Sequence, residues 1–493
     1  MKTTSVMVLL MAAVAATVML AQPALGQQEK PGVPPGIQET TETPGEYCGI
    51  CEARRNVNEL APWLNWGFDI RAREEYIKNP TLDDDASTGL GSEDLWTRVR
   101  PRIWLQAKPV EELDLSINAR LIWEYWLVCK PDSSPSVPDT NVLFDDLNVR
   151  WANIGDMPLA VTVGRQQMRF GDGWLIFEGT PGDGSRTVYF DAIRGTYTAD
   201  EMATTFDAVY VENRADTRDS LVPPFNNMGA NDPTAKGRYI AENNERGLIL
   251  YAQNKSIQST QIDGYFVWFH QGAGQGPTAA SNTPDNAADI YTLGARVAGD
   301  MTDNIQARAE GAFQFGNNQI GSVDGTSQSL CGAWGLNSRL TYNFHDDYET
   351  AGWAGYEARS GGEDPAENFN ILWGRYPQWS DLYNGYVDRI DGRPAASPNL
   401  HRLYAGGGFT PCKPLTFQAN YHLLFVDNNN VDSPAVTDNG CFRGQLVTAL
   451  LKYQFAEHIA GHLQGEAFFP GDYYSNDNND VGFFARYEIV FTW

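Results

Sequence analysis

The chain has 493 residues, of which 12% are aromatic and 20% charged, and 47 are glycines. Its formal net charge of −26 disfavours nucleic acid as a partner, because that binding depends on Lys and Arg side chains that neutralise phosphates. Beyond residue 26 the sequence contains no second long apolar run, which excludes a protein that crosses a membrane with helices.

The first 26 residues have the features of a secretory signal peptide. Lys2 supplies the positive start, residues 6–21 form an almost unbroken apolar run, and Ala24 and Gly26 place small residues before a cleavage site. An uncleaved anchor is the less favoured alternative, because the apolar run is short for a bilayer span. Residues 27–62 are rich in Pro, Glu, Thr and Gly and are expected to form a flexible periplasmic segment ahead of the folded part, residues 63–493.

Apolar and polar side chains alternate with period two along many segments of the folded part. In the last segment Tyr487 and Phe491 share one face, whereas Arg486 and Glu488 share the other, and the run ends on an aromatic residue, Trp493. Such runs are about ten residues long, which fits a tilted strand that crosses a bilayer better than a strand of a soluble sandwich. Because an open sheet edge has no hydrogen-bond partner in lipid, the sheet must close. The sequence therefore predicts an all-β, transmembrane antiparallel β-barrel.

About 18 strands are predicted, and 16 is the alternative count, because the strands at 246–254 and 349–357 are weak. The connections between them are either very short or long. Bacterial outer-membrane barrels have short periplasmic turns and long extracellular loops, so an even strand count places both termini on the periplasmic side. The predicted strands are 65–76, 95–107, 112–127, 143–153, 158–168, 187–199, 203–213, 246–254, 260–270, 290–299, 304–315, 331–343, 349–357, 401–410, 415–426, 443–455, 459–469 and 481–493.

Arginine dominates the predicted lumen face, since the chain has 27 Arg and only 9 Lys. Guanidinium offers carboxylates a planar two-point contact. Arginines two residues apart on one strand face lie about 6–7 Å from one another and could conduct an anionic polymer. The alternative is that these arginines brace the wall against Asp and Glu, which spacing alone favours. The candidate anion-binding residues from spacing are Arg71, Arg73, Arg98, Arg100, Arg102, Arg120 and Arg150, and the polar faces of later strands also carry Arg296, Arg308, Arg339 and Arg486.

Other motifs do not point to catalysis or to a metal. Cys48 and Cys51 fit a local disulfide or free thiols better than a redox pair or half of a metal site. The sequence Gly171-Asp172-Gly173 could offer oxygen ligands to Ca²⁺, but it is more typical of a turn that needs glycine at positive φ. No metal site and no cofactor are predicted, and without a nucleophile motif the chain is not expected to be an enzyme.

Residues 143–197 resemble the alginate export family of outer-membrane proteins. The resemblance rests on Gly164-Arg165-Gln166 at the end of a strand, on the Gly-Asp loop after it, and on the strand that begins Phe190-Asp-Ala-Ile-Arg194. It extends more weakly through residues 68–127. It implies an 18-stranded barrel with an Arg-rich constriction that passes an anionic uronate polysaccharide. It adds Arg165, Arg186 and Arg194 to the candidate ligand-binding residues.

The sequence thus predicts a channel in the outer membrane of a Gram-negative-type bacterium that passes anionic saccharides or polysaccharide through an Arg-rich lumen. A general outer-membrane porin or structural barrel without polymer specificity is the alternative. The expected partners are the saccharide, outer-membrane lipid and the barrel assembly machinery, because a terminal strand that ends on Trp493 resembles the signal for assembly of such barrels.

Overall fold

The computed structural model describes most of the chain from residue 61 onward. The predicted signal peptide, most of the predicted N-terminal segment, Cys48, Cys51 and Arg186 lie outside the described residues. Those described are 55–57, 61–83, 93–110, 113–129, 139–177, 190–213, 244–272, 287–320, 328–362, 364–374, 379–390, 398–429, 435–437 and 440–493.

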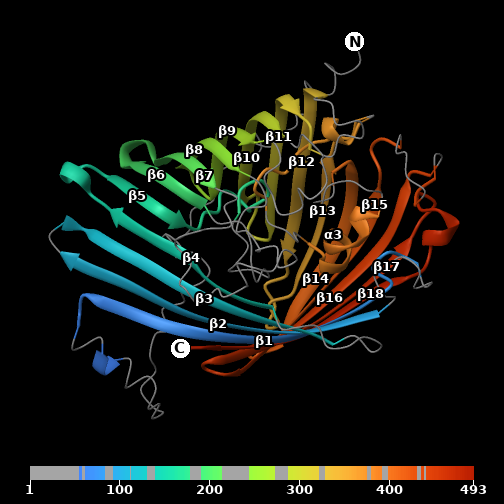
Figure 1. Cartoon of the computed structure of the whole chain (residues 1–493), viewed down its shortest axis with the longest axis horizontal. Coiled ribbons are helices and arrows are strands. Elements are labelled where there is room, and N and C mark those ends of the chain that lie inside the picture. Colours follow the sequence, from blue (N-terminus) through green and yellow to red (C-terminus); the bar gives the residue numbers. More distant parts are fainter. Residues whose placement is uncertain are drawn as a thin grey trace, which may run out of the picture.

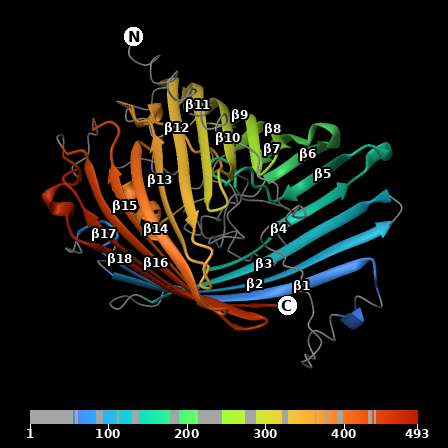
Figure 2. The same ribbon diagram turned by 180° about the vertical axis from the view of Figure 1, so that it is seen from behind.

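Eighteen antiparallel strands form one closed sheet, which confirms the predicted fold class and the higher of the two strand counts. Each strand pairs with the next one in the chain, and the first pairs with the last (Figures 1 and 2). The strands are β1 (Leu64–Lys78), β2 (Glu93–Val110), β3 (Leu115–Cys129), β4 (Asp139–Trp151), β5 (Leu159–Gln166), β6 (Phe190–Ala199), β7 (Thr204–Asn213), β8 (Glu245–Ile257), β9 (Thr260–Gln271), β10 (Ala288–Asp300), β11 (Ile305–Asn318), β12 (Gln328–Asn343), β13 (Ala351–Arg359), β14 (Leu400–Cys412), β15 (Leu415–Phe425), β16 (Phe442–Ala456), β17 (Ile459–Pro470) and β18 (Gly482–Thr492).

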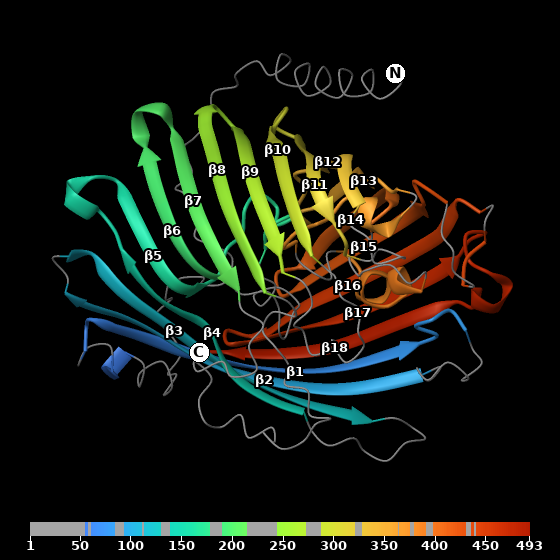
Figure 3. The same ribbon diagram turned by 45° about the horizontal axis from the view of Figure 1, so that its top comes forward.

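The connections are short at one end of the barrel and long at the other, as predicted. Residues 258–259, 413–414 and 457–458 make the tightest turns, whereas the chain between β7 and β8 and between β13 and β14 is long. The start of β1 and the end of β18 lie side by side, since Asp69 pairs with Thr492, and both lie at the short-turn end, since Leu64 pairs with Ala107 near the turn from β2 to β3 (Figure 3). The weakly predicted strands at 246–254 and 349–357 correspond to β8 and β13, so the alternative count of 16 is wrong. No described helix has the length and apolar character needed to cross a bilayer.

Lipid-facing and lumen-facing side chains alternate along the strands. On β10, Leu293 is 52% exposed on the outer face, whereas its neighbour Thr292 is fully buried inside. Exposed aromatic side chains gather where the strands reach the short turns, which is the position of an interfacial girdle in outer-membrane barrels. They are Trp151, Tyr197, Phe206, Tyr342, Phe344, Tyr348, Phe409, Tyr453 and Phe455.

The seam between β1 and β18 is closed by backbone and by rings. The backbone NH of Phe68 donates to the carbonyl of Trp493 at 3.1 Å, and the NH of Trp493 donates back to Phe68 at 2.9 Å. The Trp493 ring lies 5.1 Å from Trp66 and 4.6 Å from Phe68, both in edge-to-face contact. The terminal tryptophan thus holds the end of the chain on its first strand.

We expect a charge on the outer face to destabilise the barrel according to its depth. Leu293→Arg, in the middle of β10, should lower the free energy of unfolding by about 2–4 kcal/mol, because the guanidinium must enter hydrocarbon. Phe344→Arg, in a short turn, should lower it by only about 0–1 kcal/mol. Denaturant titration of both variants in lipid vesicles measures the difference, and equal losses would contradict this assignment of the outer face.

Candidate functional site: the lumen cavity

Two chain segments fold into the barrel and meet inside it. We call residues 167–177, which follow β5, the first inner segment, and the described residues 360–362, 364–374 and 379–390, between β13 and β14, the second inner segment. The backbone NH of Phe177 donates to the carbonyl of Trp373 at 2.9 Å. The rings of Trp174 and Phe369 stack at 5.5 Å. The segments therefore support one another rather than only the wall.

Apolar packing holds the first inner segment against β6 to β12. Phe170 stacks on Tyr251 at 4.6 Å, and Trp174 is buried in the same hydrophobic cluster. Gly335 on β12 gives these rings their space, since a Cβ there would lie 2.7 Å from both Trp174 and Phe369. Gly247, on β8, likewise leaves space for the ring of Trp373. Burial of such large rings makes a major contribution to keeping the segment inside the lumen.

The Gly-Asp-Gly sequence forms a turn in the first inner segment, as its glycines predicted. Gly171 has φ +55° and Gly173 has φ +78°. Between them, the Asp172 carboxylate pairs with Arg296 at 3.0 Å and with Arg308 at 2.9 Å. Burial opposes ionisation of this carboxyl, but Arg308 and Arg296 outweigh it, so the pKa of Asp172 lies below its ordinary value.

The second inner segment is held by a carboxylate of the barrel wall, Glu466 on β17. It contains the short helix α3 (Asp381–Gly385), whose N-cap, Ser380, accepts a hydrogen bond from the Tyr383 NH at 2.8 Å. Glu466 on β17 accepts from the NH groups of Asp381 at 3.0 Å and Leu382 at 3.1 Å. These donors at the helix start need an acceptor, so Glu466 is satisfied by the segment that it anchors.

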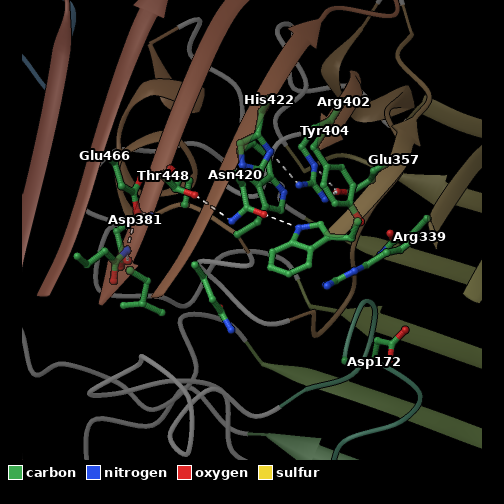
Figure 4. A pocket seen from close by; sticks show the side chains of 18 of the residues that line it. Asp172, Arg339, Glu357, Asp381, Arg402, Tyr404, Asn420, His422, Thr448 and Glu466 are labelled. Carbon is green, nitrogen blue, oxygen red and sulfur yellow. Dashed lines mark hydrogen bonds and ion pairs between the residues drawn. The ribbon is translucent and has the colours of Figure 1, made fainter. Parts of the chain in front are cut away.

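Between the inner segments and the wall lies a cavity of about 700 Å³. Its wall on β11 to β14 is basic and aromatic, with the Arg339 guanidinium 4.5 Å from the Trp353 ring and the Arg402 guanidinium 4.1 Å from the Tyr404 ring (Figure 4). The wall on β15 to β17 carries amides and hydroxyls. Asn420, at its centre, accepts from the Trp353 Nε1 at 2.7 Å and so fixes the ring under Arg339. The amide and hydroxyl residues are Gln418, Asn420, Thr448 and Gln464.

The carboxylates of the cavity lining are engaged by donors of the protein itself. Glu357 pairs with Arg402 at 2.7 Å, and Glu488 pairs with Arg73 at 2.5 Å. Asp381 pairs with Arg486 at 2.7 Å.

Three cations of the same lining, unlike these carboxylates, have no ion-pair partner in the described chain. Arg169, Arg339 and Lys452 form no ion pair with any residue in the described part of the chain. The cavity therefore has cationic groups available to a solute, whereas its anionic groups are already bound.

Nine of the ten arginines predicted to bind an anion lie on the described barrel wall. Arg71 stands opposite Arg100, and Arg73 stands opposite Arg98, so β1 and β2 bring the predicted ladder together. Arg150 is exposed. The others form ion pairs with wall carboxylates: Glu488 for Arg71 and Arg73, Glu75 for Arg98, Asp69 for Arg100 and Arg102, Asp145 for Arg120, Asp191 for Arg165 and Asp207 for Arg194.

These pairs give the wall-bracing alternative a physical basis. None of the nine arginines is among the described residues that line the cavity. Their contact with a solute stays a prediction. The cationic side chains that do line the cavity were not among the residues predicted to bind an anion. The period-two pattern had placed Arg308 and Arg339 on lumen faces, but it carries no signal for Arg169, which lies on the first inner segment outside a strand.

No group of three or more His, Cys, Asp or Glu residues that could hold a metal occurs in the described ranges. Cys412 and Cys441 are free thiols on the surface.

We expect the ion pairs of Asp172 to hold the first inner segment steady from neutral pH to about pH 5. Because the pKa of Asp172 is lowered from 3.8, their stabilisation is complete above that value and is lost as the pH falls through the lowered pKa. Single-channel current should stay quiet to about pH 5 and become noisy only in stronger acid. Asp172→Asn should be noisy at neutral pH, and a quiet current in this variant at every pH would contradict the assignment.

Comparison with known proteins agrees with this architecture. The chain matches the model of the alginate export family over residues 62–485. Among solved structures, OccK8 (OprE) of Pseudomonas aeruginosa is 11% identical with a TM-score of 0.52, over 87% of this chain and 98% of that one. OccAB2 of Acinetobacter baumannii is 9% identical with a TM-score of 0.51, again over 87% and 98%.

At such identities these structures show the fold alone. Comparison with curated proteins gave no match. The family match, in contrast, extends over most of the chain and over all of the strands except the end of β18. The protein belongs to the alginate export family and is an outer-membrane β-barrel channel of the Gram-negative type.

Proposed function

We propose that this channel passes anionic saccharides or polysaccharide through the lumen cavity. The observation that carries the proposal is the unequal state of the charges in the cavity lining. Its carboxylates are bound by donors of the protein, whereas Arg169, Arg339 and Lys452 make no ion pair in the described chain. A solute carboxylate gains attraction there without having to displace a partner from these three groups.

The remaining chemistry of the cavity suits a sugar. A sugar ring has an apolar face that packs on an aromatic ring, and Trp353 lines the cavity with its Nε1 bonded to Asn420 and the Arg339 guanidinium 4.5 Å from its ring. Sugar hydroxyls both donate and accept hydrogen bonds, as do the amides on β15 to β17. A uronate unit could therefore place its carboxylate at Arg339 and its hydroxyls toward Asn420 and Gln418.

The arginines on the wall have a different part in this proposal. Arg71, Arg73, Arg98, Arg100 and Arg102 are gathered on β1 and β2 beside three carboxylates, Asp69, Glu75 and Glu488. They brace the wall and add positive potential along the path.

The proposal also includes two further points. The barrel assembly machinery recognises the terminus of β18, and the protein has no enzymatic activity.

Block of single-channel current by oligosaccharides tests the proposal. Tetragalacturonate should block the wild-type channel at lower concentration than neutral maltotetraose. Arg339→Gln should raise the Kd of tetragalacturonate by about tenfold, because one charge-assisted hydrogen bond contributes about 1.5–3 kcal/mol. The Kd of maltotetraose should change little.

Arg246→Gln is the matched control, since Arg246 is an exposed arginine on β8 that lies 3.7 Å from Glu212 and does not line the cavity. It should leave both Kd values unchanged. Equal block of the wild type by the charged and the neutral oligosaccharide would instead support the general porin.

A further inference from the structure

One carboxylate of the cavity is set among four arginines. Asp172 contacts Arg296 on β10 at 3.0 Å and Arg308 on β11 at 2.9 Å, and its charge also interacts with Arg169. Arg339 stands directly opposite Arg308 in the register of β11 and β12. Asp172 thus lies within a group of four arginines, of which Arg296 also has a second carboxylate, Asp263, beside it.

The two close arginines of Asp172 are not equivalent. Arg296 also pairs with Asp263 at 3.2 Å, and Asp263 is fully buried in the wall. Arg308 pairs with Asp172 alone among the described residues, and its side chain is 32% exposed. If Asp172 left, Arg296 would keep a wall partner, but Arg308 would become free for another carboxylate.

The backbone brings Asp172 to this place by close contact with the wall. A Cβ on Gly171 would lie 2.9 Å from the Cδ of Arg296 and 3.2 Å from the Tyr251 hydroxyl. Gly171 also has φ +55°, which a larger residue adopts only with strain. Glycine at position 171 therefore lets the backbone approach the wall closely enough for the Asp172 carboxylate to contact these arginines.

The arginine group is open to the cavity. Arg169, Asp172, Arg308 and Arg339 all line it, and the Asp172 side chain is 23% exposed. Paired residues on neighbouring antiparallel strands have Cα atoms about 4.5–5.5 Å apart, so one carboxylate can reach both Arg308 and Arg339. A carboxylate of a solute in the cavity would compete with the Asp172 carboxylate for Arg308.

We propose that Asp172 is an internal competitor, which in the empty channel occupies part of a carboxylate-binding site formed by Arg308, Arg339 and Arg169. A carboxylate of the solute takes the place of the Asp172 carboxylate at Arg308 and adds the contact to Arg339. The inference rests on the proposed function, and it makes affinity for anions a balance between solute and protein carboxylates. Weak binding of this kind favours passage over retention.

The test is block of single-channel current by tetragalacturonate in Asp172→Asn. Removal of the competing charge should lower the Kd by about three- to tenfold at low ionic strength, with a smaller effect in high salt. The Kd of neutral maltotetraose should stay the same. The double variant Asp172→Asn with Arg308→Gln should lose the gain, because the freed arginine is then absent.

Glu212→Gln is the control, since it makes the same change of carboxylate to amide at a pair with Arg246 that does not line the cavity. Heat-modifiable migration verifies that each variant is a closed barrel. An unchanged or higher Kd for tetragalacturonate in Asp172→Asn would overturn the inference, and so would an equal gain for maltotetraose, which would mean that the lumen had only widened. A wild type without preference for the charged probe would overturn the proposed function together with it.

Discussion

The constraint on which the structure depends is that a polar group removed from water must find its partner within the protein. For the backbone this closes the sheet, and β1 pairs with β18 over residues that are more than 400 positions apart in the chain. For the buried carboxylates it imposes arginine neighbours on the wall. Glu488 and Arg73, one from each side of the seam, meet both demands at the same place.

The same constraint determines which charges a solute can use. The chain carries a formal net charge of −26, yet the carboxylates around the cavity are paired or capped. Cations without such a partner remain in its lining, among them Arg339 on the face of Trp353. The field that a solute experiences is therefore determined by pairing inside the lumen rather than by the total charge of the protein.

Local patterns predicted most of the barrel. Period two placed all the strands, including β8 and β13, and it placed Arg98, Arg100 and Arg102 on one inner face. The glycines around Asp172 predicted its turn. These features depend on neighbours in sequence, where the alternation of side chains and the freedom of glycine act directly.

The cavity could not be predicted in the same way. Its form depends on the contact of Trp174 with Phe369 and of Phe177 with Trp373, which joins two connections about 200 residues apart. Apolar residues in a connection do not show which wall they will meet. Nor does the sequence show that Arg73 finds its carboxylate at Glu488, so spacing alone could not separate arginines that brace the wall from those that face the solute.

Ion selectivity tests the account most directly. We predict that the refolded channel in a planar bilayer, under a gradient of potassium chloride, shows a reversal potential on the side of chloride. The reason is that Arg169, Arg339 and Lys452 line the cavity without an ion pair to any described residue. A reversal potential on the side of potassium, as the net charge alone would suggest, would contradict the claim that the cationic side chains of the lumen determine ion selectivity.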